Sequence, residues 1–268
     1  MSLHRYLSRV VGGGILAFAA SWGLGGAAFA DPVVISGGHW DLDVEYDGAN
    51  EEFEFHWHLH GTDTSIEPDE AILYLDPTNT GLSRPGGSQW DFLGTGAGDP
   101  VYILPFDEPT DLSSLVWLGL SAEEIATGTF DPSSITLSLV GFSGPGEFSL
   151  FTTDSFGSPN VFMATSDGLS GGDAINLTLG SHRHANWAFT ELGLYGLTFE
   201  ASGTLPGGQL IRSTPTTFYF GVGVDSFPDQ PGVIPEPASI AMLGMGVVAV
   251  GGAAWLRRRR EGSESRTV

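Results

Sequence analysis

Six histidines, gathered in three short segments, are the side chains of this sequence with the most evident chemistry. They are His39, then His56, His58 and His60, then His182 and His184. Neutral imidazole is the commonest protein ligand for zinc, and it also suits copper and nickel. A spacing of two residues places side chains on one face of a β-strand. The three segments therefore predict a histidine-rich metal site on a β-sheet.

The first two histidine segments lie in strands predicted at 38–46 and 51–60. In each strand, acidic residues and histidines occur at every second position and so share one face. A two-residue loop, Gly48-Ala49, suits a type II′ hairpin that would pair Asp41 with His56 and His39 with His58. This register sets polar side chains opposite polar ones and aromatic opposite aromatic, whereas a slip of one residue would mix the faces. Facing carboxylates repel one another, and a bound cation would relieve that repulsion.

The third histidine segment precedes Trp187 and Phe189, which are predicted to reach the core. If its strand joins the same sheet, three or four nitrogen ligands would meet, which suits tetrahedral zinc. The alternative is that the histidines are solvated on a polar strand face. An oxygen-only calcium site is less well supported, because no EF-hand pattern is present. The predicted metal ligands are His39, Asp41, His56, His58, His60, His182 and His184.

The elements that must position these residues read as β-strands throughout. Short runs rich in Val, Ile, Phe, Tyr, Trp and Thr alternate with Gly, Pro, Asp, Asn and Ser. This pattern predicts an all-β fold, an antiparallel β-sandwich of jelly-roll type. One helical turn is expected over 121–127, where Ser121 would cap it. The predicted strands are 38–46, 51–60, 71–76, 101–105, 134–141, 146–153, 160–165, 174–179, 183–190, 193–203 and 216–224.

Composition narrows the function classes. The chain has no cysteine, so neither a disulfide nor a thiolate ligand is available. It has no lysine either, and between residues 31 and 232 there are 29 acids against Arg84, Arg183 and Arg212, a formal charge of about −26. Such a surface repels nucleic acid and anionic lipid, which excludes them as partners. The surplus acid attracts cations, or serves solubility and adaptation to salt.

Both ends of the chain carry export signals. Residues 1–30 read as a signal peptide, with Arg5 and Arg9, an apolar run and a small-x-small site at Ala28-Phe29-Ala30. Residues 238–256 form an apolar run of near-spanning length, and Arg257–Arg260 follow, which keeps that end cytoplasmic. The predicted organisation is a signal peptide at 1–30, an exported domain at 31–232, a sorting segment with a transmembrane helix at 233–260 and a cytoplasmic tail at 261–268.

Pro235-Glu236-Pro237, the hydrophobic helix and the arginines resemble, in this order, the PEP-CTERM sorting signal. The resemblance covers residues 235–260 and implies recognition and cleavage by an exosortase. It implies that the protein is anchored in the inner membrane at first and, after sorting, reaches the cell surface or the extracellular space. The bare physical alternative is a single-pass anchor that persists.

The exported part has motifs that resemble a bacterial surface-anchored domain, also called choice-of-anchor M. The resemblance spans about 39–205, and its most specific part is His182-Arg-His-Ala-Asn-Trp187-Ala-Phe189. The further motifs are His56-Trp-His-Leu-His60, Leu118-Gly-Leu-Ser-Ala-Glu-Glu-Ile125 and Gly144-Pro-Gly-Glu-Phe148. Such domains occur near metal-uptake systems, and some PEP-CTERM relatives are similar to proteins under zinc-responsive repression. The resemblance implies zinc handling at the envelope.

Three functions compete. The leading one is a non-enzymatic, envelope-associated protein that binds zinc or another divalent transition metal. The second is a structural or adhesive protein that contacts extracellular polysaccharide through Trp90 or the loop at 81–98, although Trp90 also suits a loop anchor packed on the core. The third is a metal hydrolase with Glu54 as base. It is disfavoured because His-Glu-x-x-His is absent, and because Ser170 and Ser181 lack a recognisable triad context.

Overall fold

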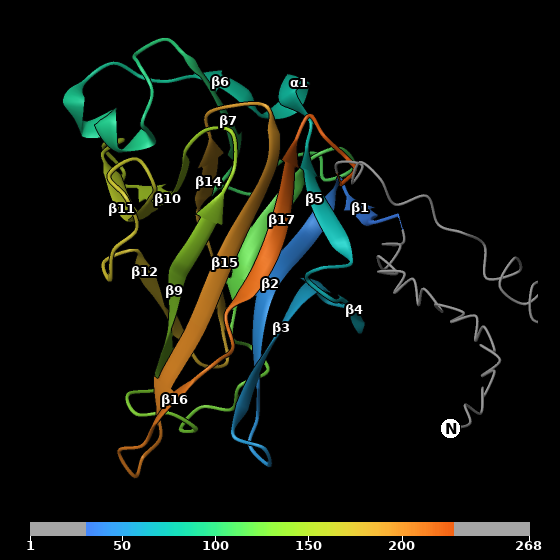
Figure 1. Ribbon diagram of the computed structural model, residues 1–268, viewed down its shortest axis with the longest axis vertical. Helices are drawn as coiled ribbons and strands as arrows, with labels where there is room; N and C mark the ends of the chain where they lie inside the picture. Colours follow the sequence, from blue (N-terminus) through green and yellow to red (C-terminus); the bar gives the residue numbers. More distant parts are fainter. Residues whose placement is uncertain (1–30, 228–268) are drawn as a thin grey trace, which may run out of the picture. The chain divides into compact units, whose positions relative to one another are not determined.

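The structure, a computed structural model, describes residues 31–227, which form three β-sheets and two short helices (Figure 1). The predicted all-β fold is therefore confirmed. The predicted signal peptide at 1–30 and the sorting segment and tail at 233–268 lie outside the described residues. Among residues 31–227, no helix has the length and apolar character that crossing a membrane requires.

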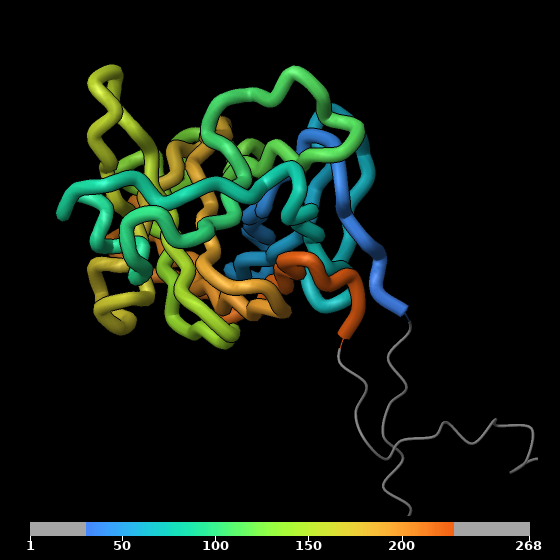
Figure 2. The backbone as a smooth tube through the Cα atoms, turned by 90° about the horizontal axis from the view of Figure 1, so that it is seen from above, coloured from blue at the N-terminus to red at the C-terminus, as the bar shows by residue number. Residues whose placement is uncertain are grey.

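The largest sheet has seven strands and includes the first and last strands of the described chain. Its order is β1-β5-β17-β15-β9-β12, with β16 paired to β15. β5 runs parallel to both β1 and β17, so the two ends of the described chain lie beside one strand (Figure 2). The strands are β1 (Val33–Ile35), β5 (Ala71–Leu75), β9 (Ser134–Ser143), β12 (Ala174–Thr178), β15 (Gly193–Thr204), β16 (Leu210–Arg212) and β17 (Thr216–Val222).

Two five-stranded sheets complete the fold, together with the helices α1 (Pro77–Thr80) and η1 (Ser88–Leu93). One has the order β11-β10-β14-β7-β6, and the other, which carries the histidines, has the order β13-β8-β2-β3-β4. The first contains β6 (Gly81–Ser83), β7 (Pro100–Leu104), β10 (Phe148–Thr153), β11 (Pro159–Ala164) and β14 (Asn186–Phe189). The second contains β2 (Gly38–Asp47), β3 (Glu52–Leu59), β4 (Thr64–Ile66), β8 (Val116–Ser121) and β13 (His182–His184).

Aromatic side chains join the seven-stranded sheet to both smaller sheets. Trp57 on β3 meets Phe218 on β17 edge-on, with ring centroids 4.8 Å apart. Trp187 on β14 stacks on Phe220 of β17 at 5.5 Å. All four rings are fully buried, and rings of this size dominate the energetics of a core. The inner face of the histidine-bearing sheet is thus fixed, and alternation leaves its other face for polar side chains.

Two of the three sheets are mixed, so the prediction of a purely antiparallel sandwich is wrong. β2 and β8 pair in parallel, as β5 does with β1 and β17. Parallel neighbours need a crossover rather than a tight hairpin, and a pattern of alternating residues does not reveal crossovers. The jelly-roll arrangement stays a prediction. The predicted strands are present to within a few residues; those missed are β1, β4, β6, β8 and β16.

The single strand predicted over 183–190 is two strands. β13 pairs with β8 in one five-stranded sheet, and β14 pairs with β7 and β10 in the other. The chain changes sheets at Ala185, which is fully buried. As predicted, Trp187 and Phe189 reach the core, and both are fully buried. Only the buried Ala185 separates the histidines of β13 from β14, whose Trp187 and Phe189 lie in the core.

The hairpin of β2 and β3 is confirmed, but its predicted register is wrong by two residues. Asp41 pairs with His58 and Asp43 with His56, not Asp41 with His56. The loop is longer than the two-residue turn expected, because Asp47 pairs with Glu52 and accepts a hydrogen bond from the Ala49 amide at 2.8 Å. A shift of two residues keeps each side chain on its face. Hydrophobic patterning therefore could not detect it.

The helical turn predicted over 121–127 is an irregular turn without a helix. The Ser121 hydroxyl does accept a hydrogen bond from the Glu123 amide, at 3.1 Å, as a capping residue would. The Ile125 amide donates to the Ala122 carbonyl at 3.3 Å, and no further helical turn follows. This turn sets Glu123 beside the histidines.

Candidate metal centre

The polar face of the β13-β8-β2-β3 strands brings distant parts of the sequence into one row. β13 pairs with β8, β8 with β2 and β2 with β3, in a register that aligns four residues across the sheet. His39 and His60 form a neighbouring pair, because the His60 amide donates to the His39 carbonyl at 3.0 Å. The aligned residues are His184, Gly119, Asp41 and His58.

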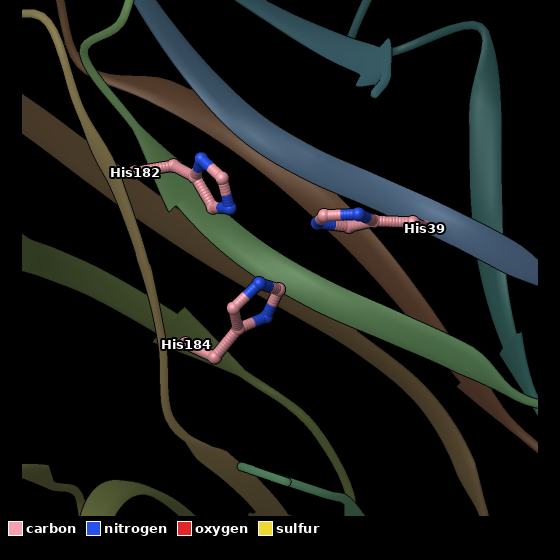
Figure 3. A group of neighbouring side chains, drawn as sticks. All are labelled: His39, His182 and His184. Carbon is pink, nitrogen blue, oxygen red and sulfur yellow. The ribbon is translucent and has the colours of Figure 1, made fainter. Parts of the chain in front are cut away.

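Four imidazole rings meet on this face. His39 stacks on His60 with ring centroids 4.1 Å apart, and it lies 4.9 Å from the ring of His184 and 5.4 Å from that of His182. The His60 and His182 rings are 4.6 Å apart. His39 comes from β2, and His182 and His184 come from β13, so their rings point into one shared space (Figure 3).

Two carboxylates complete the group. Asp41 is fully buried, and its Oδ2 lies 3.1 Å from His60 Nδ1 while its Oδ1 lies 3.7 Å from His39 Nε2. Glu123 accepts a hydrogen bond from His182 Nδ1 at 2.7 Å and has its other oxygen 3.8 Å from His60 Nδ1. Three sets of three ligand atoms lie within 4.8 Å of one another: His39, His182 and His184; His39, Asp41 and His60; His60, Glu123 and His182.

Backbone and aromatic contacts fix the orientation of His184. Its Nδ1 lies 3.1 Å from the Leu118 carbonyl, which only accepts, so this nitrogen must be the donor. Trp117 stacks on the ring at 3.7 Å with an interplanar angle of 5°. In the neutral ring, Nε2 then carries the free lone pair, the arrangement typical of a metal-ligating histidine. Among residues 31–227, this buried Nε2 has no hydrogen-bond partner, and neither does that of His39.

Electrostatics keep these two rings neutral near pH 7. Burial, together with the neighbouring histidines, lowers the pKa of both His39 and His184 to about 4. Burial raises the pKa of Asp41, against the effect of His182 and His60. Burial would also raise the pKa of Glu123, but the hydrogen bond from His182 and the charges of the neighbouring histidines together outweigh burial and lower it. Neutral imidazoles beside a buried carboxylate form the donor set that a divalent cation requires.

No basic side chain of the described residues offsets the acids of this face. The chain has no lysine, and Arg183, although it is part of β13, lies over the ring of Phe162 at 4.9 Å. The other two arginines of residues 31–227 are Arg84, paired with Asp91, and Arg212, paired with Glu200. The positive charge that would balance Asp41 must therefore come from a protonated histidine or from a bound cation.

Gly119 leaves the space that the Asp41 carboxylate occupies. A Cβ at this position would lie 2.0 Å from Asp41 Oδ1 and 3.3 Å from His184 Cε1. Gly119→Ala is therefore expected to displace Asp41, to abolish tight metal binding and to lower the free energy of unfolding by about 1–3 kcal/mol, the usual cost of overpacking. Metal titration and urea unfolding would measure both effects.

Gly171→Ala is the matched control for Gly119→Ala, because a Cβ at Gly171 would meet no atom within 4 Å. We expect this control to leave metal binding and stability unchanged. Full metal affinity in the Gly119→Ala protein would show that the position of Asp41 does not matter for binding.

The metal-free protein is expected to lose stability on acidification. Because the pKa values of His39 and His184 fall from 6.5 to about 4 on folding, the unfolded chain binds more protons between these pH values. Stability then rises with pH across this window, by on the order of 2 kcal/mol for the two rings after allowing for solvent screening. The raised pKa of Asp41 acts in the opposite direction.

Urea unfolding of the chelator-treated protein at pH 7 and pH 4.5 measures this dependence. The double variant His39→Gln/His184→Gln is expected to flatten it, because glutamine does not titrate. An equal pH slope in the variant and the parent would assign the dependence to other groups.

The structure gathers five of the seven predicted ligands: His39, Asp41, His60, His182 and His184. His56 and His58 lie on the same polar face but belong to none of the three ligand sets. His56 lies between Glu45 and Glu67, and His58 Nε2 is 2.7 Å from the Thr62 carbonyl. The sequence prediction did not include Glu123, which belongs to one of the three ligand sets. A local signal for Glu123 was its position in the turn that Ser121 caps, two residues after that serine.

Two residues weighed for other functions have ordinary surroundings. The segment from Gly168 to Gly172 matches the Gly-x-Ser-x-Gly spacing, but Ser170 lies in a loop directly before a turn, and its hydroxyl donates to Asp173 at 3.1 Å. Trp90 in η1 packs near Phe151, with ring centroids 5.9 Å apart. It also lines a hollow of about 350 Å³. Ser170 thus lacks the strand-to-helix elbow of a hydrolase nucleophile, whereas Trp90 remains open to a ligand.

Comparison with known proteins bears on the end of the chain. A family model described as the PEP-CTERM protein-sorting motif matches residues 233–260. This confirms the predicted sorting signal and indicates an exported protein that is membrane-anchored before sorting. The motif implies processing by the exosortase machinery. Neither the curated proteins nor the solved structures contain a match to this chain. The resemblance of residues 39–205 to choice-of-anchor M domains stays a prediction.

Proposed function

We propose that this exported protein binds a divalent transition metal, zinc in the first instance, at the cluster of His39, His182 and His184, and that it is not an enzyme. Asp41, His60 and Glu123 would supply further donors or neutralise the charge of the ion. The sorting motif supports a role at the cell envelope, with the cell surface or the extracellular space as the final location. A metal-uptake system is the partner that such a role would serve.

The observation that carries this proposal is the pair of buried Nε2 atoms on His39 and His184, which lack hydrogen-bond partners among residues 31–227. Leaving a buried polar atom unsatisfied costs about 1–3 kcal/mol. His39 and His184 form a set with His182 in which one ring nitrogen of each residue lies within 4.8 Å of those of the other two. A metal ion between them would satisfy both lone pairs.

The donor set favours zinc over harder ions. Three imidazoles suit Zn²⁺, Cu²⁺ or Ni²⁺, whereas Ca²⁺ and Mg²⁺ require oxygen ligands. Tetrahedral zinc with Zn–N distances of about 2.0–2.1 Å brings its nitrogens to about 3.4 Å from one another. Small rotations of the side chains would close the present spacing to that value. Asp41 or His60 would then provide the fourth ligand.

Metal content and calorimetry test the proposal. The full-length chain, purified in detergent without a polyhistidine tag, should bind close to one equivalent of Zn²⁺ tightly and show Zn²⁺ by mass spectrometry. The variant His182→Gln/His184→Gln should lose that equivalent. Zinc uptake that is weak, superstoichiometric and unchanged in the variant would show a generic acidic surface instead.

A second function is favoured by Trp90, which lines the hollow of about 350 Å³ together with Leu82, an apolar side chain that is 60 % exposed. Aromatic rings beside open hollows suit the apolar faces of sugars. An adhesive protein would bind a polysaccharide there independently of metal. Binding to soluble glucans that survives chelation and is lost in Trp90→Ala would support this function over the first.

A further inference from the structure

Asp43 is a buried carboxylate that the histidine cluster does not use. Its side chain is fully buried, and among residues 31–227 neither of its oxygens has a hydrogen-bond partner. Taking an unpaired carboxylate out of water costs on the order of several kcal/mol unless an opposite charge compensates. The position of Asp43 is therefore one at which a cation would be strongly stabilised.

The neighbours of Asp43 are donors of the kind that hold a divalent cation. Asp43 lies opposite His56 on β3 and beside Ser121 on β8. Glu45 lies two residues further along β2, on the same face, with its Oε1 3.3 Å from His56 Nδ1. The other ring nitrogen of His56 lies 3.7 Å from Glu67 Oε1. One imidazole is thus set between two carboxylates and next to a third, which is buried.

Electrostatic effects connect Glu124 to the same group. Burial raises the pKa of Glu45 against the opposing effect of His56, and the charges of Asp43 and Glu124 raise it further. Burial lowers the pKa of His58, but the backbone hydrogen bond with Thr62 and the charges of Asp43, Asp41 and Glu124 together raise it. Glu123 faces the histidine cluster, whereas the adjacent Glu124 adds its charge to this second group.

The second group also has access to solvent. His56 and Glu67 line an open hollow of about 570 Å³ whose wall includes Glu52, Glu54 and Asp69. An entry path is one of the requirements of a metal site. An acidic hollow attracts cations, and its lining brings them as far as His56 and Glu67.

We propose that Asp43, Glu45 and His56 form a second divalent-cation site, which takes an oxygen-preferring ion of the Mn²⁺ class. Carboxylates suit manganese, and one imidazole is compatible with it. Glu67 and Glu124 surround the site with further negative charge. The site would lie one row along the sheet from the histidine cluster and would share no ligand with it. It therefore stands on its own observation, the two unpartnered oxygens of Asp43.

Manganese binding tests this site. The full-length chain in detergent would first receive one equivalent of Zn²⁺ and then be titrated with Mn²⁺, whose free aquo ion is counted by electron paramagnetic resonance. We expect one Mn²⁺ per chain. Asp43→Asn, which keeps the size of the side chain, should weaken Mn²⁺ binding about tenfold or more, as does the loss of a group that merely supports a ligand. Glu45→Gln should weaken it as well.

Three comparisons separate the two sites. Glu108→Gln, an exposed acid elsewhere, should leave Mn²⁺ binding unchanged. His39→Gln should lose zinc and keep Mn²⁺, whereas Asp43→Asn should keep zinc, which also shows that this variant is folded. Parental Mn²⁺ affinity in both Asp43→Asn and Glu45→Gln would overturn the second site. Failure of zinc to bind the parent chain would instead overturn the histidine site alone.

Discussion

His39→Gln is expected to weaken zinc binding by more than about 100-fold, the upper range for loss of a group that only supports a ligand. His39 belongs to two of the three ligand sets, one with His182 and His184 and one with Asp41 and His60. Replacing His39 removes a ligand from both of these sets. The set that remains, His60, Glu123 and His182, does not include Asp41. Calorimetric titration with Zn²⁺ would measure the change.

His56→Gln is the matched control for this prediction, because it removes an imidazole from the same sheet face. His56 lies between Glu45 and Glu67, outside all three ligand sets. The control is expected to bind zinc at the histidine cluster as the parent does. Equal losses in the two variants would mean that zinc spreads over the whole face rather than occupying one centre.

Zinc is expected to raise the melting temperature of the protein by about 5–10 °C at a concentration 100 times its Kd. Ligand binding to the folded state alone adds about 2.7 kcal/mol at that ratio. Each kcal/mol shifts the melting temperature of a domain of this size by roughly 2–4 °C. The ion would also neutralise Asp41, which is buried beside His60 and, among residues 31–227, has no arginine partner. Thermal scans with zinc, and then with added chelator, would measure the shift.

The control for zinc stabilisation is Mg²⁺ at the same ionic strength, because magnesium prefers oxygen ligands and retains several waters. Magnesium would report the effects of screening the acidic surface and of occupying the carboxylates of Asp43 and Glu45, without occupying the histidine cluster. A melting temperature raised equally by both ions would indicate screening or carboxylate binding in place of zinc ligation by the histidines.

The sequence was sufficient to predict most strands, because the β-branched and aromatic runs and the turn residues between them have a period that reports directly on strand faces. It was insufficient for the order of the strands. The parallel pairing of β2 with β8 depends on a crossover between segments far apart in the chain. β8 itself was missed as a strand, since Gly119 interrupts its apolar run and strand propensity disfavours glycine.

The candidate site could be predicted in its residue types but not in its membership. Spacing showed that the histidines share faces; five of the six project from strands of one sheet, and His60 follows directly after β3. The convergence of β13 on β2 requires β8 between them, and nothing local in the sequence specifies that strand order. The two-residue error in the predicted hairpin register gave Asp41 the partner His56, whereas in the structure its partner is His58. Glu123 was assigned to a helix start because its cap was visible and its spatial neighbours were not.

The donors of the histidine cluster are graded in their access to water. The side chain of Asp41 is 0 % exposed and that of His39 is 16 % exposed, compared with 24 % for His182, 31 % for His60 and 37 % for Glu123. A competing ligand would therefore approach a bound ion from one side and replace the outer donors in sequence. The rate of metal release is then expected to grow with the concentration of the acceptor, instead of being set by dissociation into water. Such kinetics suit transfer of an ion to another protein better than long-term storage.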